Sequence, residues 1–474
     1  MSCRCRHPPV ASRNNQILSV RQMRAAEEAL IAAGSSVDQL MQIAGHGASE
    51  WVWRMAGHRA VTVLCGPGNN GGDGYVIAEA LRERGSAVQV IAATEPKTEA
   101  ACNARALYRG AVLGPDADPQ GDVLVDCLFG SGLTRSLTSE HMALLGRLAA
   151  SHARCIAIDL PSGIDSDSGE PLNPNLPDWH LTVALGAWKQ AHFLMPACAT
   201  MGALRLVDIG VEAVPEAAQL IARPALQAPA AAAHKYRRGL LGVVGGAMPG
   251  AALLAARAAQ HGGAGYVKLL GSGTDAPADL VTDAGPLGRP LSDTRYAALL
   301  VGPGLGRDKP ARERLKAALA AQVPTVLDAD ALVLVRARDT HDHIHPRIIT
   351  PHEGEFAVLE RAFKLPGVGT KIDRAVELAA SCGSIVVAKG PDTVVARGDG
   401  RVALAPRASS WLSTAGTGDV LAGVIASRLA SGLDPFEAAC QGVWLHGAAA
   451  RLCGPVFTAA QLADMVQSAY AACL

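Results

Sequence analysis

The sequence has few aromatic residues: they make up 4% of its 474 residues, although 49% are hydrophobic. A core with so few rings must be built from Ala, Val, Leu and Ile, a composition that suits buried parallel strands covered by alanine-rich helices. The sequence also has no net charge, because 43 Lys and Arg balance 43 Asp and Glu. This balance gives no sign of a nucleic-acid partner or of an anionic membrane partner.

Long apolar segments and close-spaced cysteines are also lacking. No run of about 18 or more apolar residues occurs, so no membrane-spanning helix is expected. The 11 cysteines are scattered, apart from Cys3-x-Cys5, which predicts a reduced, cytoplasmic compartment. The first 25 residues hold five arginines and no acidic residue, so this stretch is either a targeting segment or a terminal tail.

Two series of alternating strand-like and helix-like segments divide the chain. Residues 19–58 have helical spacing, and short apolar runs follow at 61–65, 88–92, 123–127, 155–160 and 181–185. The second series has runs at 240–244, 266–270, 297–301, 325–327, 347–350 and 385–388, a small hairpin over 394–397 and 402–404, and helices from Gly418 and Pro435. Such alternation predicts parallel, doubly wound sheets. We therefore predict an α/β fold with domains over residues 1–213 and 232–474, joined by an Ala- and Pro-rich linker over 214–231.

The strongest local signal in the first domain is the segment Cys65–Gly74, which reads CGPGNNGGDG. Its five glycines permit positive φ values and close approach of backbones. The backbone N–H groups and the start of the next helix can then hold a phosphate. The spacing fits neither the Lys-containing phosphate loop nor the G-x-G-x-x-G dinucleotide fingerprint. A tight strand-to-helix turn without a ligand is the alternative.

Two further strand ends in the first domain carry polar residues, in the segments 125–133 and 158–165. Because ligands of open parallel sheets bind at the carboxyl ends of the strands, Asn70, Asp126, Asp159 and Ser162 are expected at one sheet edge. Oxygen ligands of this type suit an alkali or alkaline-earth cation. The alternative is that each Asp merely caps a helix.

These three loops, together with Gln22–Arg24 and Leu40–Gly45, resemble the N-terminal domain of NAD(P)H-hydrate epimerases over residues 18–212. The resemblance implies a Rossmann-like three-layer α/β/α domain. It implies potassium held by Asn70, Asp126 and Ser162, and a role for Asp159 in proton transfer at the nicotinamide. The residues that it implies in substrate binding are Asn69, Asn70, Gly71, Gly72, Asp73, Gly130, Ser131, Gly132, Leu133, Thr134, Arg135, Ser136 and Asp159.

The second domain contains the segment Ser413–Gly423, which reads STAGTGDVLAG. The N–H groups of residues 416–418 can form an anion hole at a helix N-terminus, and Asp419 beside them can act as a base on a hydroxyl. A buried helix with Asp419 as its cap is the alternative. Four other segments place Gly, Asp, His or Lys at strand ends: 300–306, 327–332, 350–356 and 389–393.

With residues 234–239 and 245–251, this ensemble resembles the ribokinase-like superfamily, and within it the ADP/ATP-dependent NAD(P)H-hydrate dehydratases, over residues 232–472. The resemblance implies a ribokinase-like α/β domain that uses ADP or ATP with Mg²⁺. The adenine nucleotide would be held by Lys389, Gly390, Pro391, Asp392, Thr393 and Gly418. The hydrated nicotinamide nucleotide would face Ala251, Gly304, His352 and Asp419.

Together the two resemblances predict a bifunctional enzyme that repairs hydrated NADH and NADPH. Its partners would be small substrates, with no nucleic acid and no membrane, and we expect a homo-oligomer. A vitamin-precursor kinase of the ribokinase superfamily, or a non-catalytic nucleotide-binding role for the first domain, are the alternatives. The alternating histidines His341, His343 and His345 precede a strand, away from the expected site edge, so we do not predict a zinc site there.

Overall fold

The computed structural model describes residues 13–119, 121–271, 276–339 and 345–474. The chain forms two compact units, Met1–Gln219 and Leu220–Leu474. The stretch predicted as a linker holds the short strand β10 (Ala218–Leu220), which pairs antiparallel with β1 (Gln16–Leu18). The arginine-rich start of the chain lies largely outside the described residues, and so do His341 and His343.

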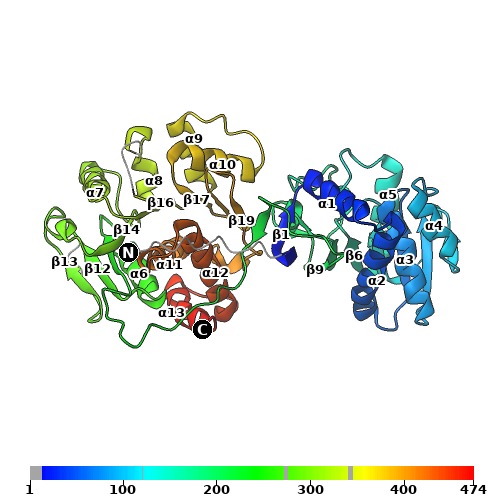
Figure 1. Ribbon diagram of the computed structural model, residues 1–474, viewed down its shortest axis with the longest axis horizontal. Helices are drawn as coiled ribbons and strands as arrows, with labels where there is room; N and C mark the ends of the chain where they lie inside the picture. The colour runs from blue at the N-terminus through cyan, green and yellow to red at the C-terminus, as the bar shows by residue number, and fades with distance from the viewer. Residues whose placement is uncertain (1–12, 120, 272–275, 340–344) are drawn as a thin grey trace. The chain divides into compact units, whose positions relative to one another are not determined.

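The first unit is built on a parallel sheet with the strand order β4-β3-β2-β5-β6-β7-β9 (Figure 1). Its strands are β2 (Val61–Cys65), β3 (Val88–Ala92), β4 (Ala111–Leu113), β5 (Gly121–Cys127), β6 (His152–Ile158), β7 (Leu181–Leu185) and β9 (Ala203–Val207). Its helices are α1 (Val20–Ala32), α2 (Val37–Ala56), α3 (Asn69–Glu83), α4 (Glu99–Leu107) and α5 (Ser139–Ser151), with β8 (Trp188–Lys189) and the short turns η1 (Arg13–Asn15), η2 (Gln190–His192) and η3 (Ala197–Ala199).

Alternate residues of these strands face two different cores. Val61 and Val63 of β2 pack with residues of α2, α3 and α4, whereas Leu64 packs in a second core with residues of α5. Successive strand side chains point to opposite faces of a sheet, so the helices form one layer on each side. The predicted three-layer α/β/α arrangement is therefore confirmed.

One strand of the first unit ends earlier than its apolar run predicts. The run at 155–160 gives β6, which spans His152–Ile158. Asp159 has a φ of 66°, which is left-handed and incompatible with an extended strand. The strand therefore stops before this residue, and Asp159 starts the loop that reaches the site.

The second unit has the strand order β13-β12-β11-β14-β15-β16-β17-β18-β19, parallel as far as β17 and antiparallel through the last two strands. Its strands are β11 (Leu240–Val244), β12 (Tyr266–Leu270), β13 (Val281–Asp283), β14 (Tyr296–Val301), β15 (Thr325–Leu327), β16 (Arg347–Ile349), β17 (Ile385–Ala388), β18 (Val394–Ala396) and β19 (Val402–Leu404). The hairpin predicted at 394–404 is thus present.

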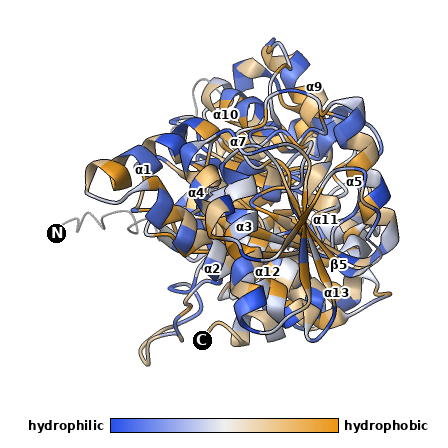
Figure 2. Ribbon diagram, turned by 90° about the vertical axis from the view of Figure 1, so that its right-hand side faces the viewer, coloured by the Kyte–Doolittle hydropathy of each residue, from blue (hydrophilic) through white to orange (hydrophobic). Residues whose placement is uncertain are grey.

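Helices α6 (Pro249–His261), α11 (Thr417–Ala430) and α12 (Pro435–Cys453) supply one core of the second unit, together with residues of the central strands. Most of this core is Ala, Val, Leu and Ile, as the scarcity of aromatic residues predicts. Figure 2 colours the strands around β5 of the first unit mainly as hydrophobic. The other helices are α7 (Lys309–Ala320), α8 (Asp330–Leu334), α9 (Glu353–Phe363), α10 (Lys371–Cys382) and α13 (Ala459–Ala471), with the short turns η4 (Pro290–Ser292), η5 (Ala337–Asp339) and η6 (Ser410–Leu412). None of the helices in the described part of the chain combines the length and hydrophobicity that crossing a bilayer requires.

Candidate active sites

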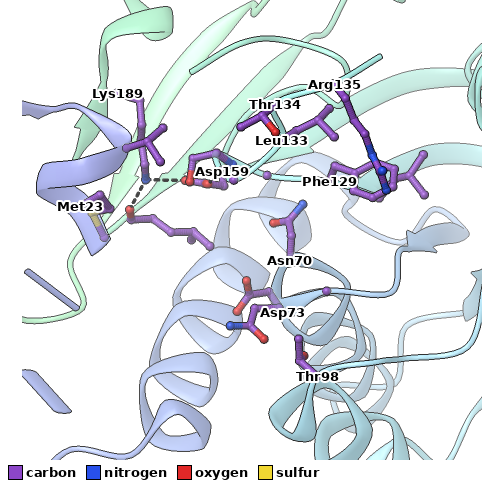
Figure 3. A pocket seen from close by; sticks show the side chains of 18 of the residues that line it. Met23, Asn70, Asp73, Thr98, Phe129, Leu133, Thr134, Arg135, Asp159 and Lys189 are labelled. Carbon is purple, nitrogen blue, oxygen red and sulfur yellow. Dashed lines mark hydrogen bonds and ion pairs between the residues drawn. The ribbon is translucent and has the colours of Figure 1, made fainter. Parts of the chain in front are cut away.

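A cavity of about 650 Å³ lies in the first unit at the carboxyl ends of β2, β5 and β6 (Figure 3). One face of α1 also lines it. The predicted substrate-binding residues that line the cavity are Asn69, Asn70, Asp73, Gly130, Ser131, Gly132, Leu133, Thr134, Arg135, Ser136 and Asp159. Gly71 and Gly72 are buried and do not belong to this lining. The topology thus brings three separate sequence motifs around one space.

The glycine-rich segment forms the start of α3, with Gly68 as the N-cap residue and no side chain capping the helix. The expectation of positive φ values is wrong, because Gly66, Gly68 and Gly71 are not among the residues with positive φ. The glycines are needed for close approach instead. A Cβ on Gly66 would lie 1.8 Å from the carbonyl oxygen of Leu128, and one on Gly71 would lie 1.9 Å from that of Gly66. This packing leaves the N–H groups of the first helical turn available to an anion.

Asp126 and Ser162 form one hydrogen-bonded unit beneath the cavity. The Ser162 hydroxyl donates to Oδ1 of Asp126 at 2.8 Å, and the Ser162 N–H donates to Oδ2 at 2.9 Å. The N–H of Phe129 donates to the Ser162 hydroxyl at 2.9 Å. Burial raises the pKa of Asp126 to about 6, against the lowering effect of the hydrogen bonds from Ser162 and Leu128. Asp126 therefore links two loops and is not a helix cap.

Asn70 approaches the same loop from α3. Its amide oxygen and nitrogen are both buried and have no hydrogen-bond partner among the described residues. A Cβ on Gly130 would lie 3.2 Å from Cγ of Asn70 and 3.0 Å from Oδ2 of Asp159. Buried amides are nearly always hydrogen-bonded, so an unpartnered one at a cavity wall points to a ligand.

Asp159 forms a buried ion pair with Lys189 at the cavity wall, with Nζ 2.5 Å from Oδ1 (Figure 3). The N–H of Ser131 donates to the other carboxylate oxygen at 2.9 Å. Burial raises the pKa of Asp159, but Lys189 and Ser131 outweigh this effect, and the pKa lies below its usual value. Asp159 is thus a carboxylate that faces the cavity and does not cap a helix.

Lys189 was not predicted from the sequence, although a signal was present. Residues 1–213 contain only two lysines, Lys97 and Lys189. Lys189 follows the strand run at 181–185, at the edge where Asp159 was expected. A lone lysine in a strongly apolar stretch is rarely buried unless it is paired, and this rule would have suggested a carboxylate partner.

In the second unit, Asp419 lies in the first turn of α11, whose N-cap residue is Gly416 with a φ of 89°. No side chain caps this helix, so the alternative role of Asp419 as a cap is excluded. The Thr417 N–H bonds to the Thr414 carbonyl at 3.3 Å, so part of the predicted anion hole is already used. The N–H groups of Gly418 and Asp419 belong to the first turn and have no acceptor within the helix.

Asp419 faces a buried charge cluster at the ends of β15, β16 and β17. Lys389 Nζ lies 2.8 Å from Oδ1 of Asp328 and 3.7 Å from Oε2 of Glu355. The Thr350 hydroxyl donates to the same Asp328 oxygen at 2.6 Å. Burial, and next the negative charge of Asp328, raise the pKa of Asp419 to about 7, while Lys389 opposes this shift. The sequence placed Asp328 at a strand end but gave it no role.

The other predicted residues of the second unit lie on neighbouring loops. A Cβ on Gly418 would lie 3.6 Å from Lys389 Nζ, so two of the predicted nucleotide contacts are adjacent. Gly304 has a φ of 63°, and its carbonyl accepts a hydrogen bond from Met248 at the start of α6, the helix that also carries Ala251. His352 caps α9 through Nδ1, which accepts from the N–H groups of residues 354 and 355.

Side-chain contacts hold the segment Lys389–Thr393, one within the segment and one to Lys371. The Thr393 hydroxyl donates to the Gly390 carbonyl at 2.8 Å, and Lys371 bonds to Asp392 at 2.5 Å. In the described ranges no group of three or more His, Cys, Asp or Glu is arranged to hold a metal ion.

Two family models match the chain. The model described as YjeF-related protein N-terminus matches residues 37–191, and the model described as NAD(P)H-hydrate dehydratase matches residues 241–470. The bifunctional NAD(P)H-hydrate repair enzyme Nnr of Moorella thermoacetica is 33% identical over 442 residues, which cover 83% of each chain. The Mycobacterium leprae enzyme of the same name is 32% identical over 92% of this chain and 93% of its own.

A solved structure is also similar to part of this chain. It is the ADP/ATP-dependent NAD(P)H-hydrate dehydratase from Bacillus subtilis, co-crystallised with ATP and Mg²⁺. It is 29% identical, with a TM-score of 0.47, and the match covers 53% of this chain and 95% of that chain.

Two α/β units, each with an uncapped helix N-terminus beside buried carboxylates, define a two-site enzyme of nucleotide chemistry. The chain belongs to the family of bifunctional NAD(P)H-hydrate repair enzymes, because it is similar to those enzymes over most of its length. The family predicted from the motifs is confirmed. The α/β class predicted for the second unit is confirmed as well, since its sheet is mainly parallel and strands alternate with helices.

Proposed function

We propose that the first unit interconverts the R and S hydrates of NADH and NADPH, and that the second unit dehydrates the S hydrate at the expense of ADP or ATP. The observation that carries this proposal is the presence of both matched regions in one chain, each with its own site at a sheet edge. The two reactions complement each other, since epimerisation supplies the dehydratase with the epimer that it uses.

In the first unit, the segments 69–73 and 130–136 would contact the nucleotide and Asp159 would face the hydrated ring. The cavity of about 650 Å³ falls within the usual range of about 300–1,000 Å³ for small-molecule sites. Uncapped N–H groups at the start of α3 suit the phosphates. Two side chains that could act on protons, Asp73 and Asp159, lie in the same lining.

The residues Asn70, Asp126 and Ser162 fit a potassium ion. The buried, unpartnered Asn70 amide supplies a free oxygen, and Asp126 supplies one buried carboxylate. One carboxylate with neutral oxygens balances a single positive charge and would leave a divalent ion under-neutralised. A bound cation would neutralise Asp126 and hold Asn70 against the loop at Gly130.

In the second unit, Asp419 would take the proton of the substrate hydroxyl while that oxygen attacks the terminal phosphorus of the nucleotide. The bond from this phosphorus to the bridging oxygen breaks, so that AMP leaves from ADP, or ADP from ATP. The C–O bond of the phosphorylated intermediate then breaks, and phosphate leaves with the bonding pair. The lone pair of the ring nitrogen forms a second bond to the same carbon. Loss of a proton from the adjacent carbon completes the double bond. Residues 389–393 and Gly418 would hold the nucleotide, and Ala251, Gly304 and His352 the hydrated substrate. Magnesium would neutralise the phosphates of the nucleotide.

The function is tested with a mixture of R and S hydrates of NADH, supplied with ADP or ATP and Mg²⁺. We expect the absorbance of reduced nicotinamide to return and both epimers to disappear. A stable phosphorylated product without this absorbance would instead identify a small-molecule kinase. Consumption of the S epimer alone would contradict the epimerase assignment.

Potassium is tested separately, by following epimer interconversion with chromatography after exchange of potassium for a large organic cation. We expect the rate to fall, and Asp126→Ala to lower it as well. Asp122→Ala is the matched control, because Asp122 lies on the same strand, β5, at its opposite end. Undiminished interconversion without potassium would contradict the cation site.

A further inference from the structure

Lys189 is a deeply buried lysine of the first unit, and only 1% of its surface is exposed. Its ammonium donates to Asp159 Oδ1 at 2.5 Å and to the carbonyl oxygen of Leu185 at 2.6 Å. These two acceptors, one a carboxylate and one a backbone carbonyl, fix the position of the ammonium. An ammonium has three N–H bonds, and two of them are accounted for by these contacts.

The backbone N–H, the backbone carbonyl and the second carboxylate oxygen of Asp159 also form hydrogen bonds. Its N–H donates to the Val183 carbonyl at 2.7 Å, and its Oδ2 accepts from the N–H of Ser131. Its own carbonyl accepts from His192 Nε2 at 2.9 Å. The N–H of Lys189 donates to His192 Nδ1 at 2.9 Å, which fixes the proton of this imidazole on Nε2. Burial, and next the charge of Lys189, lower the pKa of His192 to about 4, so His192 is neutral and adds no second cation.

Two acidic groups that share the cavity with Asp159 oppose its ionisation. Glu27 of α1 and Asp73 of α3 line the same cavity as Asp159. Burial raises the pKa of Glu27, and burial together with the charge of Asp159 raises that of Asp73. Arg24 of α1 also lines the cavity, but it forms no recorded ion pair with Asp159 in the described part of the chain. Lys189 is thus the cation in direct contact with Asp159.

We propose that Lys189 is a positioning residue of the epimerase reaction, whose ammonium keeps Asp159 a carboxylate aimed at the hydrated ring. This proposal rests on the epimerase function proposed above. The epimers differ at the carbon that carries the hydroxyl, next to the ring nitrogen. Asp159 takes the hydroxyl proton, the O–H pair becomes the second bond of a carbonyl, and the C–N pair moves to the nitrogen and its conjugated carboxamide. Reclosure on the opposite face, with the proton returned by Asp159, gives the other epimer.

The test is the pH profile of epimer interconversion in the full chain, measured by chromatography for the unaltered protein and for Lys189→Met. Methionine keeps the length of the side chain but removes the charge. An adjacent opposite charge lowers the pKa of a carboxyl by about 1–3 units, so we expect the acidic limb of the profile to move up by about that amount. Interconversion at mildly acidic pH should fall, and it should recover as the pH rises. An unchanged profile, or a uniform loss at every pH, would overturn the proposal.

Two comparisons keep this result interpretable. Lys189→Arg retains the charge, so its acidic limb should stay near that of the unaltered protein; a shift as large as that of Lys189→Met would overturn the proposal. Dehydration of the S hydrate by the second unit of the same variants should be unchanged, which shows that the second unit is folded, and the far-UV circular dichroism and thermal unfolding of each variant should match those of the unaltered protein, which shows the same for the first unit. Absence of interconversion in the unaltered protein would be a different failure, because it removes the epimerase function itself.

Discussion

Lys389 and Asp328 form a buried ion pair in the second unit, with the lysine Nζ 2.8 Å from Oδ1 of the aspartate. They come from the ends of two strands, β17 and β15, that are not neighbours in the sheet. Burial lowers the pKa of Lys389, but the negative charges of Asp328 and Glu355 outweigh this effect, so the pKa lies above its usual value. Because both partners also face Asp419, this pair sets the electrostatic environment of the proposed base.

Asp419→Asn should abolish dehydration and leave nucleotide binding largely intact. The amide keeps the size of the side chain but cannot accept the hydroxyl proton, and a general base contributes about 10²–10⁴-fold to a rate. The measurement is the return of reduced-nicotinamide absorbance, with nucleotide binding by calorimetry. Asp399→Asn is the matched control, because Asp399 is an exposed carboxylate on the β18–β19 hairpin. A loss of less than tenfold would show that Asp419 is not the base.

Dehydration should rise with pH through about 7, because the pKa of Asp419 is raised to about 7 and only its carboxylate form accepts a proton. The negative charge of Asp328 contributes to this upward shift. Asp328→Asn should therefore lower the midpoint of the profile, and Lys389, released from Asp328, should lower it further. The rate of the S-hydrate reaction at saturating nucleotide, measured from pH 5 to 9, reports this midpoint. An upward displacement in Asp328→Asn would refute this electrostatic account.

Gly130→Ala should slow epimerisation without unfolding the chain. The new methyl group would lie 3.0 Å from Oδ2 of Asp159 and 3.2 Å from Cγ of Asn70, so it would push apart two groups that face the ligand. Gly146→Ala is the control, since Gly146 lies on α5 outside the cavity lining and no atom lies within 4 Å of its Cβ. Interconversion rates and thermal unfolding of both variants are compared. Equal rates in the two variants would contradict the prediction.

A fragment of residues 220–474 should be a soluble dehydratase that uses one epimer only. The division of the chain falls between residues 219 and 220, and Ile221 and Leu226 belong to the cores of the second unit. The shorter fragment 225–474 lacks Ile221, whose N–H bonds to the Leu404 carbonyl, so its unfolding midpoint should be lower. Consumption of both epimers by either fragment would contradict the division of labour.

The sequence by itself determined the elements and the family. Apolar runs at 61–65, 88–92, 181–185 and 240–244 became strands with those same bounds, because a buried strand must be apolar on both faces. The glycine-rich segments predicted the positions of α3 and α11, because a helix start that receives an anion needs small residues and open N–H groups. These signals are local, and each can be recognised within about ten residues of sequence.

The tertiary structure alone decided which charges meet. Lys189 is 30 residues from Asp159, and Lys389 is 61 residues from Asp328. Neither spacing has a periodicity that a sequence pattern could reveal, because partners at the ends of different strands are set by strand order. The reason for the glycines at 66 and 71 was likewise tertiary, since it lies in the backbone atoms that pack against them and not in their own φ values. The ionisation of Asp159 and Asp419 follows from burial and from these pairings, and both arise only when the sheets assemble.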